Sequence, residues 1–174
     1  MKKLLFITLM ILSFVNTAQA ESPAKKSGIQ ITDINGKSYM VTGTKEGLKI
    51  SGTEGKVVFL EFFGHQCPPC LASVPHLVNL QKKHKDKLAI IGVEVQGLNE
   101  AQLKAFAQSK GINYTVISGQ KERLFVSYIS QRAQWQGSIP FLLVLDTKGD
   151  VQYIQTGMVP ESSLEAIFQK LSKK

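Results

Sequence analysis

The first part of the chain after residue 28 alternates between apolar and polar positions. This alternation over residues 29–34 predicts a strand, and a second short strand follows over 38–42. Asn35-Gly36 lies between them and is a strong signal for a tight β-hairpin turn. Residues 43–56 contain four glycines and predict a loop with one short strand near 48–50. The region therefore begins with a β-hairpin.

Beyond this hairpin the apolar residues form continuous runs. Residues 57–63 are apolar except for Glu61, and 88–95 form a second run, as is typical of strands buried on both faces. Asp146 to Gly149 predicts a turn that joins two of the remaining strands. Those further strands are predicted over 112–117, 141–145 and 151–155.

Segments with helical periodicity lie between most of these predicted strands. The predicted helices span 70–84, 99–110, 121–136 and 161–171. In the third, Leu124, Phe125, Tyr128, Ile129 and Trp135 are predicted to share one inward side. Alternation of strands with helices predicts an α/β fold with a central mixed sheet flanked by helices on both faces. Because the last two long strands form a hairpin, we expect antiparallel strands at one side of the sheet.

The first twenty residues have the layout of a secretory signal peptide. Lys2 and Lys3 precede an apolar run of about twelve residues, and Ala18-Gln19-Ala20 matches a cleavage site. A membrane-spanning helix needs about 20 apolar residues, so no anchor is expected after cleavage. We therefore expect residues 1–20 to be removed, 21–28 to form a flexible leader, and 29–174 to be one soluble domain in the periplasm.

The charge of the chain does not indicate a nucleic-acid-binding protein. The 174 residues carry a formal net charge of +8, which falls to +6 without Lys2 and Lys3. The remaining lysines form short clusters, at 25–26, 82–87 and 173–174, and are not concentrated with exposed aromatic residues. A solvated basic surface explains this pattern, so no nucleic-acid partner is expected.

The chain has only two cysteines, Cys67 and Cys70. A small secreted protein held together by disulfides carries four or more, and a domain of this length can build its own core without them. A closed zinc site needs four ligands, and no second cysteine or histidine pair is present. The pair is therefore expected to perform chemistry, with no metal and no bound cofactor.

The motif Cys67-Pro68-Pro69-Cys70 lies between a predicted strand and a predicted helix, and this position indicates thiol–disulfide chemistry. The first cysteine falls at a helix N-terminus, where free N–H groups and the helix dipole favour a thiolate. Cys67 is therefore the expected nucleophile, and Cys70, one turn later, the resolving thiol. Pro68 and Pro69 stiffen the loop. His65, two residues earlier, could also favour the thiolate if it is charged.

On these residues the chain resembles the thioredoxin superfamily. Within it, ITDINGKSY and the strand entry Gly-Lys-Val-Val are similar to the periplasmic TlpA/ResA-like branch, whereas EFFGHQCPPC resembles the DsbA-like group. The resemblance implies a thioredoxin-like fold with an N-terminal β-hairpin extension. It also implies protein thiol or disulfide substrates and a membrane electron-transfer partner of the DsbD type.

The resemblance further assigns roles to individual positions. Glu61 matches a buried acid beneath the disulfide, where burial would raise its pKa and let it exchange a proton with Cys70. Ile139-Pro140 matches a cis-proline loop that faces the disulfide, where the backbone at Ile139 could pair with a substrate strand. Pro75 matches a helix kink.

The direction of the redox reaction stays open between two alternatives. The TlpA/ResA-like scaffold favours a reductase that serves cytochrome c assembly or disulfide correction. The DsbA-like residues around the cysteines favour a disulfide-forming oxidase. A third hypothesis is a Cu(I) carrier, in which the two thiolates bind the metal with His65 or Met158 as a further ligand.

Overall fold

The computed structural model describes residues 28–173, so the predicted signal peptide and leader up to residue 27 lie outside the described residues. The described chain begins with a small antiparallel sheet in the order β1-β2-β3. Its strands are β1 (Ile29–Thr32), β2 (Ser38–Gly43) and β3 (Leu48–Ile50). The predicted hairpin is confirmed, with Gly36 at a φ of 84° in its turn, and β3 extends it to three strands.

A five-stranded mixed sheet forms the centre of the molecule, in the order β6-β5-β4-β7-β8. Strands β4, β5 and β6 are parallel, whereas β7 pairs antiparallel with both β4 and β8. The strands are β4 (Val57–Phe63), β5 (Leu88–Glu94), β6 (Thr115–Ser118), β7 (Phe141–Leu145) and β8 (Val151–Thr156). Every residue of β4 is buried, as its apolar run predicts, because this strand lies in the middle of the sheet.

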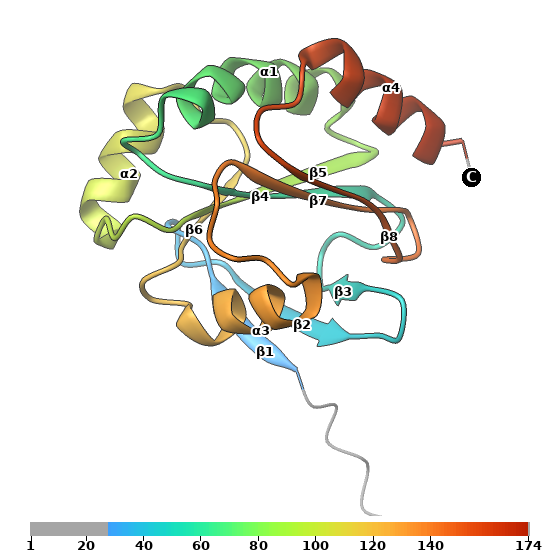
Figure 1. Ribbon diagram of the computed structural model, residues 1–174, viewed down its shortest axis with the longest axis horizontal. Helices are drawn as coiled ribbons and strands as arrows, with labels where there is room; N and C mark the ends of the chain where they lie inside the picture. The colour runs from blue at the N-terminus through green and yellow to red at the C-terminus, as the bar shows by residue number, and fades with distance from the viewer. Residues whose placement is uncertain (1–27, 174) are drawn as a thin grey trace, which may run out of the picture.

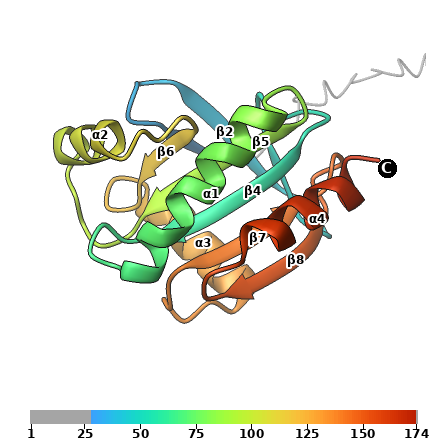
Figure 2. The same cartoon turned by 90° about the horizontal axis from the view of Figure 1, so that it is seen from above.

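Helices cover both faces of the sheet (Figures 1 and 2). They are α1 (Pro68–His84), α2 (Glu100–Ser109), α3 (Arg123–Ala133) and α4 (Glu161–Leu171). Helices α1 and α4 lie side by side over one face, and α3 lies over the other together with the small sheet. The predicted thioredoxin-like α/β architecture is therefore confirmed.

The alternation of side chains along β4 decides what lies beneath α1. Val58, Leu60 and Phe62 point into the core shared with α3 and the small sheet. Val57 and Phe59 point to the opposite face, into the core beneath α1 and α4. The same period of two places the side chain of Glu61 on the α1 side, between Phe59 and Phe63.

Several of the predicted elements differ from the structure by one to three residues at their ends, and two of these differences have a clear cause. The strand predicted from residue 112 begins only at Thr115, because the Ile112 amide donates to the Ala107 carbonyl at the end of α2. The third helix ends at Ala133, since Gln134 adopts a left-handed conformation with a φ of 52°.

The predicted inward side of that helix was wrong at one position. Leu124 is 79% exposed, whereas Phe125 and Ile129 are buried. Trp135 is buried as predicted, but it lies beyond the helix, where its ring stacks on Phe141 and its indole N–H donates to the Ser138 carbonyl. The helix is therefore anchored by a narrower apolar stripe than its sequence pattern indicates.

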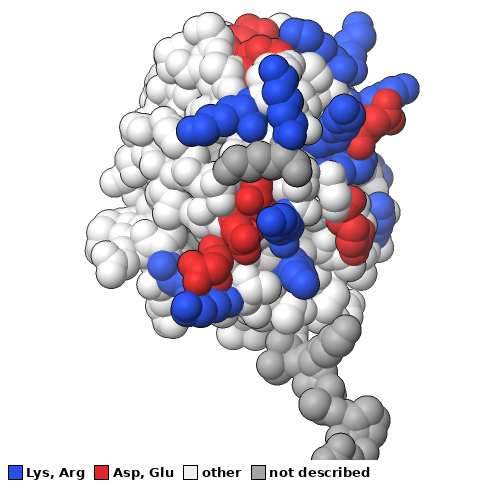
Figure 3. Space-filling view, turned by 90° about the vertical axis from the view of Figure 1, so that its right-hand side faces the viewer, with Lys and Arg blue, Asp and Glu red and all other residues white. Residues whose placement is uncertain are grey.

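Charged side chains of both signs are interspersed on the face near the C-terminal end of α4 (Figure 3). Lys83 at the end of α1 pairs with Glu165 of α4 at 3.1 Å, and His84 contacts the same carboxylate at 3.0 Å. These contacts fasten α1 to α4. Within residues 28–173 no helix is both long and apolar enough to cross a membrane.

Candidate active site

The two cysteines form a disulfide at the start of α1. Their Cα atoms are 5.2 Å apart, within the range that this bond requires. Cys67 is the N-cap residue of the helix, and its Sγ accepts a hydrogen bond from the Cys70 amide at 3.3 Å. The Cys67 residue is 7% exposed and Cys70 is fully buried. An incoming sulfur can therefore reach Cys67 more readily than Cys70.

The two prolines between the cysteines occupy the first two positions of α1. A helix leaves its first amide groups without partners inside the helix, and proline has no N–H to leave free. With Pro68 and Pro69 in these positions, the amide of Cys70 is the first N–H that the helix presents to the Cys67 sulfur. The sequence CPPC therefore aims one donor at that sulfur.

The loop before β7 lies against the same cysteines. The Ile139–Pro140 peptide bond is cis, as the family resemblance implies, and Ile139 packs against the cluster that contains Cys67 and Cys70. The Pro140 carbonyl accepts a hydrogen bond from the Gly157 amide at 2.8 Å, which ties the loop to the end of β8. Ile139 thus belongs to the apolar surroundings of the cysteine pair.

Glu61 is buried beneath α1 in an apolar layer. Its residue is 5% exposed, and burial raises the pKa of its carboxyl group to about 8. A cavity of about 10 Å³, close to the space that one water molecule needs, is lined by Glu61 and by Ser73. Ser73 lies one helical turn after Cys70, so the carboxyl group lies under the first two turns of α1.

Tyr114 is a second buried titratable group in this region. Its hydroxyl is buried and has no hydrogen-bond partner among the described residues. Burial raises the pKa of Tyr114, and the negative charge of Glu61 raises it further. The Tyr114 ring leaves little space above Gly92, the β5 residue that pairs with Glu61, because a Cβ there would lie 3.2 Å from the ring.

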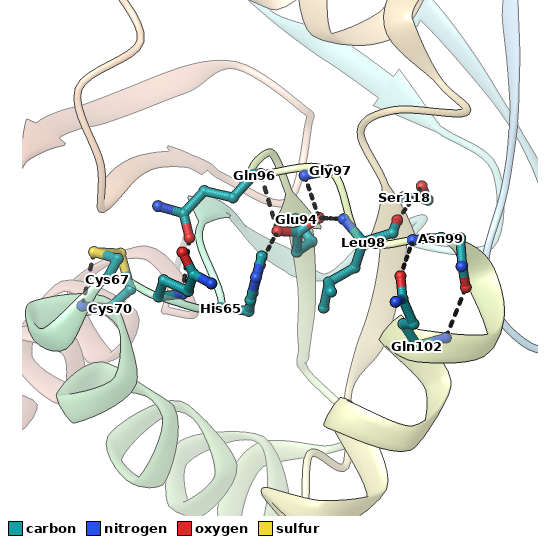
Figure 4. Close-up of polar contacts among 11 residues, drawn as sticks. His65, Cys67, Cys70, Glu94, Gln96, Gly97, Leu98, Asn99, Gln102 and Ser118 are labelled. Carbon is teal, nitrogen blue, oxygen red and sulfur yellow. Dashed lines mark hydrogen bonds and ion pairs between the residues drawn. A yellow bond between two sulfur atoms is a disulfide. The ribbon is translucent and has the colours of Figure 1, made fainter.

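His65 contacts a residue that the sequence analysis did not single out. Its Nδ1 lies 2.9 Å from the Oε1 atom of Glu94, a fully buried residue at the end of β5 (Figure 4). Next to it, the Gln66 amide donates to the Gln96 side-chain oxygen at 2.8 Å. Glu94 ends an apolar run as an isolated acid, and this signal could have identified it, as it did Glu61.

The residues considered as Cu(I) ligands are engaged in other contacts or lie apart, and Cys67 and Cys70 are joined in a disulfide. Within residues 28–173 no group of three or more histidine, cysteine, aspartate or glutamate side chains could hold a metal ion. His65 is engaged with Glu94, and Met158 is 45% exposed just after β8. These contacts do not favour the Cu(I) hypothesis.

Comparisons with known proteins agree with this geometry. The model of the AhpC/TSA family matches residues 28–154. The thioredoxin-like protein YneN of Bacillus subtilis is 29% identical over 142 residues, covering 80% of this chain and 77% of that protein. The thiol-disulfide oxidoreductase ResA of Bacillus anthracis is 26% identical over 146 residues, covering 82% and 73%.

Solved structures show the same fold. A thiol:disulfide interchange protein of the thioredoxin family from Chlorobium tepidum superimposes with a TM-score of 0.67 at 23% identity, over 83% of this chain and 93% of that one. StoA from Bacillus subtilis gives a TM-score of 0.60 at 18% identity, over 83% and 98%. With its matched family model, its relatives and its disulfide at the start of α1, the chain belongs to the AhpC/TSA family and is a thioredoxin-like protein related to ResA.

Proposed function

We propose that this protein is an exported thiol–disulfide oxidoreductase that exchanges disulfides with other proteins, in the reducing direction. The observation that carries the proposal is the Cys67–Cys70 disulfide at the N-terminus of α1, with the cis Ile139–Pro140 loop packed beside it. The relatives named thiol-disulfide oxidoreductases support the same activity.

The reaction begins with the reduced pair. The Cys67 thiolate attacks one sulfur of a substrate disulfide, forms a mixed disulfide, and releases the other substrate sulfur, which takes up a proton. The Cys70 thiol then loses its proton and attacks the Cys67 sulfur. This second step releases the remaining substrate thiol and closes the Cys67–Cys70 disulfide, so two electrons pass to the substrate.

Glu61 is proposed to take the proton from Cys70. A general base works best when its pKa lies near the operating pH, and the value of about 8 for Glu61 meets this condition. Its position beneath α1, in a small cavity that is also lined by Ser73, one helical turn after Cys70, supports this role. Cys67, at 7% exposure, is the more accessible of the two thiols.

The loop at Ile139 and Pro140 is proposed to hold the substrate. An extended substrate segment can pair with the backbone at Ile139 by strand-like hydrogen bonds. These bonds do not depend on the side chains of the substrate. The apolar Ile139 side chain packs on the cluster that contains Cys67 and Cys70. This binding mode suits an oxidoreductase that acts on several different proteins.

The reducing direction, export and partner are parts of the same proposal. The likeness to ResA-type relatives supports a reductase in the periplasm that acts in cytochrome c assembly or on incorrect disulfides. A membrane electron-transfer partner of the DsbD type would return the two electrons. A DsbA-like oxidase remains the alternative outcome, since the residues around CPPC resemble that group.

The reduction potential of the pair decides the direction. We expect protein of residues 21–174, equilibrated with glutathione or dithiothreitol mixtures, to have a potential nearer the roughly −270 mV of thioredoxin than the roughly −120 mV of DsbA. It should also reduce insulin disulfides with dithiothreitol as electron source, and Cys67→Ser should not. A potential near −120 mV would assign the oxidase function, and insulin reduction by Cys67→Ser at the parent rate would refute the exchange mechanism.

A further inference from the structure

The segment just before Cys67 is held by the loop that follows β5. Gly64 approaches the Gln96 side chain so closely that a Cβ at Gly64 would overlap it, and the Gln66 amide donates to the Gln96 oxygen at 2.8 Å. The Val95 amide also donates to the Phe63 carbonyl at 2.9 Å. The position of the nucleophile therefore depends on the end of β5 as well as on α1.

Glu94 is the centre of this arrangement (Figure 4). Its carboxylate accepts hydrogen bonds from the backbone amides of Gln96, Gly97 and Leu98 at 2.9, 3.2 and 3.0 Å. These donors fix the turn after β5. The remaining hydrogen bond is with His65 Nδ1 at 2.9 Å, and among the described residues His65 is the only side chain that hydrogen-bonds to the Glu94 carboxylate.

The contact with a carboxylate determines which nitrogen of the His65 imidazole carries the proton. A carboxylate only accepts hydrogen bonds, so the Nδ1 atom of His65 carries the hydrogen. A second proton can bind only at Nε2, where it would turn the ring into a cation. The two side chains together then have no net charge, whereas with a neutral ring they carry the single negative charge of Glu94.

The net charge of the pair matters because His65 lies in the turn that leads into Cys67. In this turn the Cys67 amide donates a hydrogen bond to the Gly64 carbonyl at 3.3 Å. Two other titratable groups lie in this region: Tyr114, ahead of β6, packs on the cluster that contains Cys67, and Glu61 lies beneath α1 in a cavity that Ser73 also lines. The α2 side chains packed on the cysteine cluster are apolar: Leu103, Phe106 and Ala107. His65, two residues before Cys67, is the titratable side chain nearest to it in sequence, and its contact with Glu94 brings the buried carboxylate to the same turn.

We propose that Glu94 is a positioning residue for thiol exchange: it orients His65 through Nδ1, so that a protonated ring balances the buried negative charge, which then does not oppose the Cys67 thiolate. His65 acts on Cys67 through this pair and not as an isolated cation. The inference rests on the proposed function, because it concerns the reactivity of the nucleophile of that reaction.

The test measures the pKa of the Cys67 thiol in a Cys70→Ser background, from the rate of iodoacetamide alkylation between pH 4 and 10. His65→Gln keeps a hydrogen-bond donor for Glu94 but removes the compensating cation. We expect it to raise the Cys67 pKa by about half a unit or more. His65→Gln combined with Glu94→Gln removes both charges, and we expect the Cys67 pKa to return to the parent value.

His65→Arg supplies a second arm that leaves Glu94 in place. Because it keeps the cation, its Cys67 pKa should stay at or below that of the parent. An unchanged pKa in His65→Gln, or a double variant that stays as high as His65→Gln, would overturn the proposal. Insulin reduction by protein with both cysteines is measured separately, so a failed pair and a failed oxidoreductase function give different results.

Discussion

The amide of Cys70 donates a hydrogen bond to the sulfur of Cys67 at 3.3 Å. This contact exists because Cys67 is the N-cap residue of α1 and the two residues between them are prolines. When the disulfide is reduced, the same N–H and the positive end of the helix dipole face the sulfur that becomes free. The motif therefore favours the thiolate form of Cys67 and not that of Cys70.

A first prediction concerns that ionisation. The pKa of Cys67 in the reduced protein should lie clearly below the ordinary cysteine value of about 8.5, because helix N-termini lower thiol pKa values. Thiolate absorbance at 240 nm in Cys70→Ser gives the value. Unfolding the same variant in urea is the control and should return the pKa to the ordinary value. A folded-state pKa at or above about 8.5 would contradict the prediction.

Glu61 gives a second, kinetic prediction. Glu61→Gln keeps the shape of the side chain but removes the base, so attack by Cys67 should change little while resolution by Cys70 slows about tenfold or more. Stopped-flow measurement of mixed-disulfide decay separates the two steps. Ser73→Ala, which changes another side chain of the same cavity without removing a base, is the matched control. An unchanged decay rate and pH profile in Glu61→Gln would show that another group carries the proton.

The same residue predicts how stability depends on pH. The pKa of Glu61 is raised in the folded protein to about 8 from an unfolded value of 4.5, so the unfolded state gives up this proton first. The ionisation of Glu61 therefore lowers the free energy of unfolding little below about pH 4.5, and this cost grows as the pH rises to about 8.

Denaturant unfolding of parent and variant at two pH values checks this dependence. Glu61→Gln should be more stable than the parent at pH 8.5, by on the order of a few kcal/mol. At pH 4.5 most of that difference should be absent. A difference of the same size at both pH values would mean that packing, and not ionisation, explains it.

The two neighbours Leu124 and Phe125 test the fold on the other face of the sheet. Phe125 is fully buried and packs near Phe62, so Phe125→Ala should lower the free energy of unfolding by about 3–5 kcal/mol. Leu124 is 79% exposed, so Leu124→Ala should change it by less than about 0.5 kcal/mol. Equal effects of the two substitutions would mean that α3 is rotated from its described position.

The sequence predicts the parts of this fold that depend on local patterns. Continuous apolar runs identify the central strands, and the position of CPPC between a strand and a helix identifies the site. Leu124 was misplaced because helical periodicity gives a direction but not the width of the covered face. Strand β6 was predicted three residues too early, because the tertiary contact of Ile112 with Ala107 replaces strand pairing there.

The supports of the active site depend on contacts between distant segments. His65 and Glu94 are 29 residues apart, and only the parallel pairing of β4 with β5 brings the ends of these strands together. The sequence singled out His65 as a possible cation near the thiol, but it does not show that His65 contacts Glu94. Glu61 could be predicted because a lone acid in a buried strand is costly whatever its neighbours are.

Trapping of the mixed disulfide tests the central claim most directly. Reduced Cys70→Ser and Cys67→Ser proteins are each mixed with an oxidised protein substrate, quenched with acid, and analysed by non-reducing electrophoresis and mass spectrometry. The account predicts that Cys70→Ser accumulates a complex joined through Cys67, and that Cys67→Ser, whose remaining thiol is fully buried, forms little or none. Equal trapping through Cys70, or no complex with either variant, would contradict it.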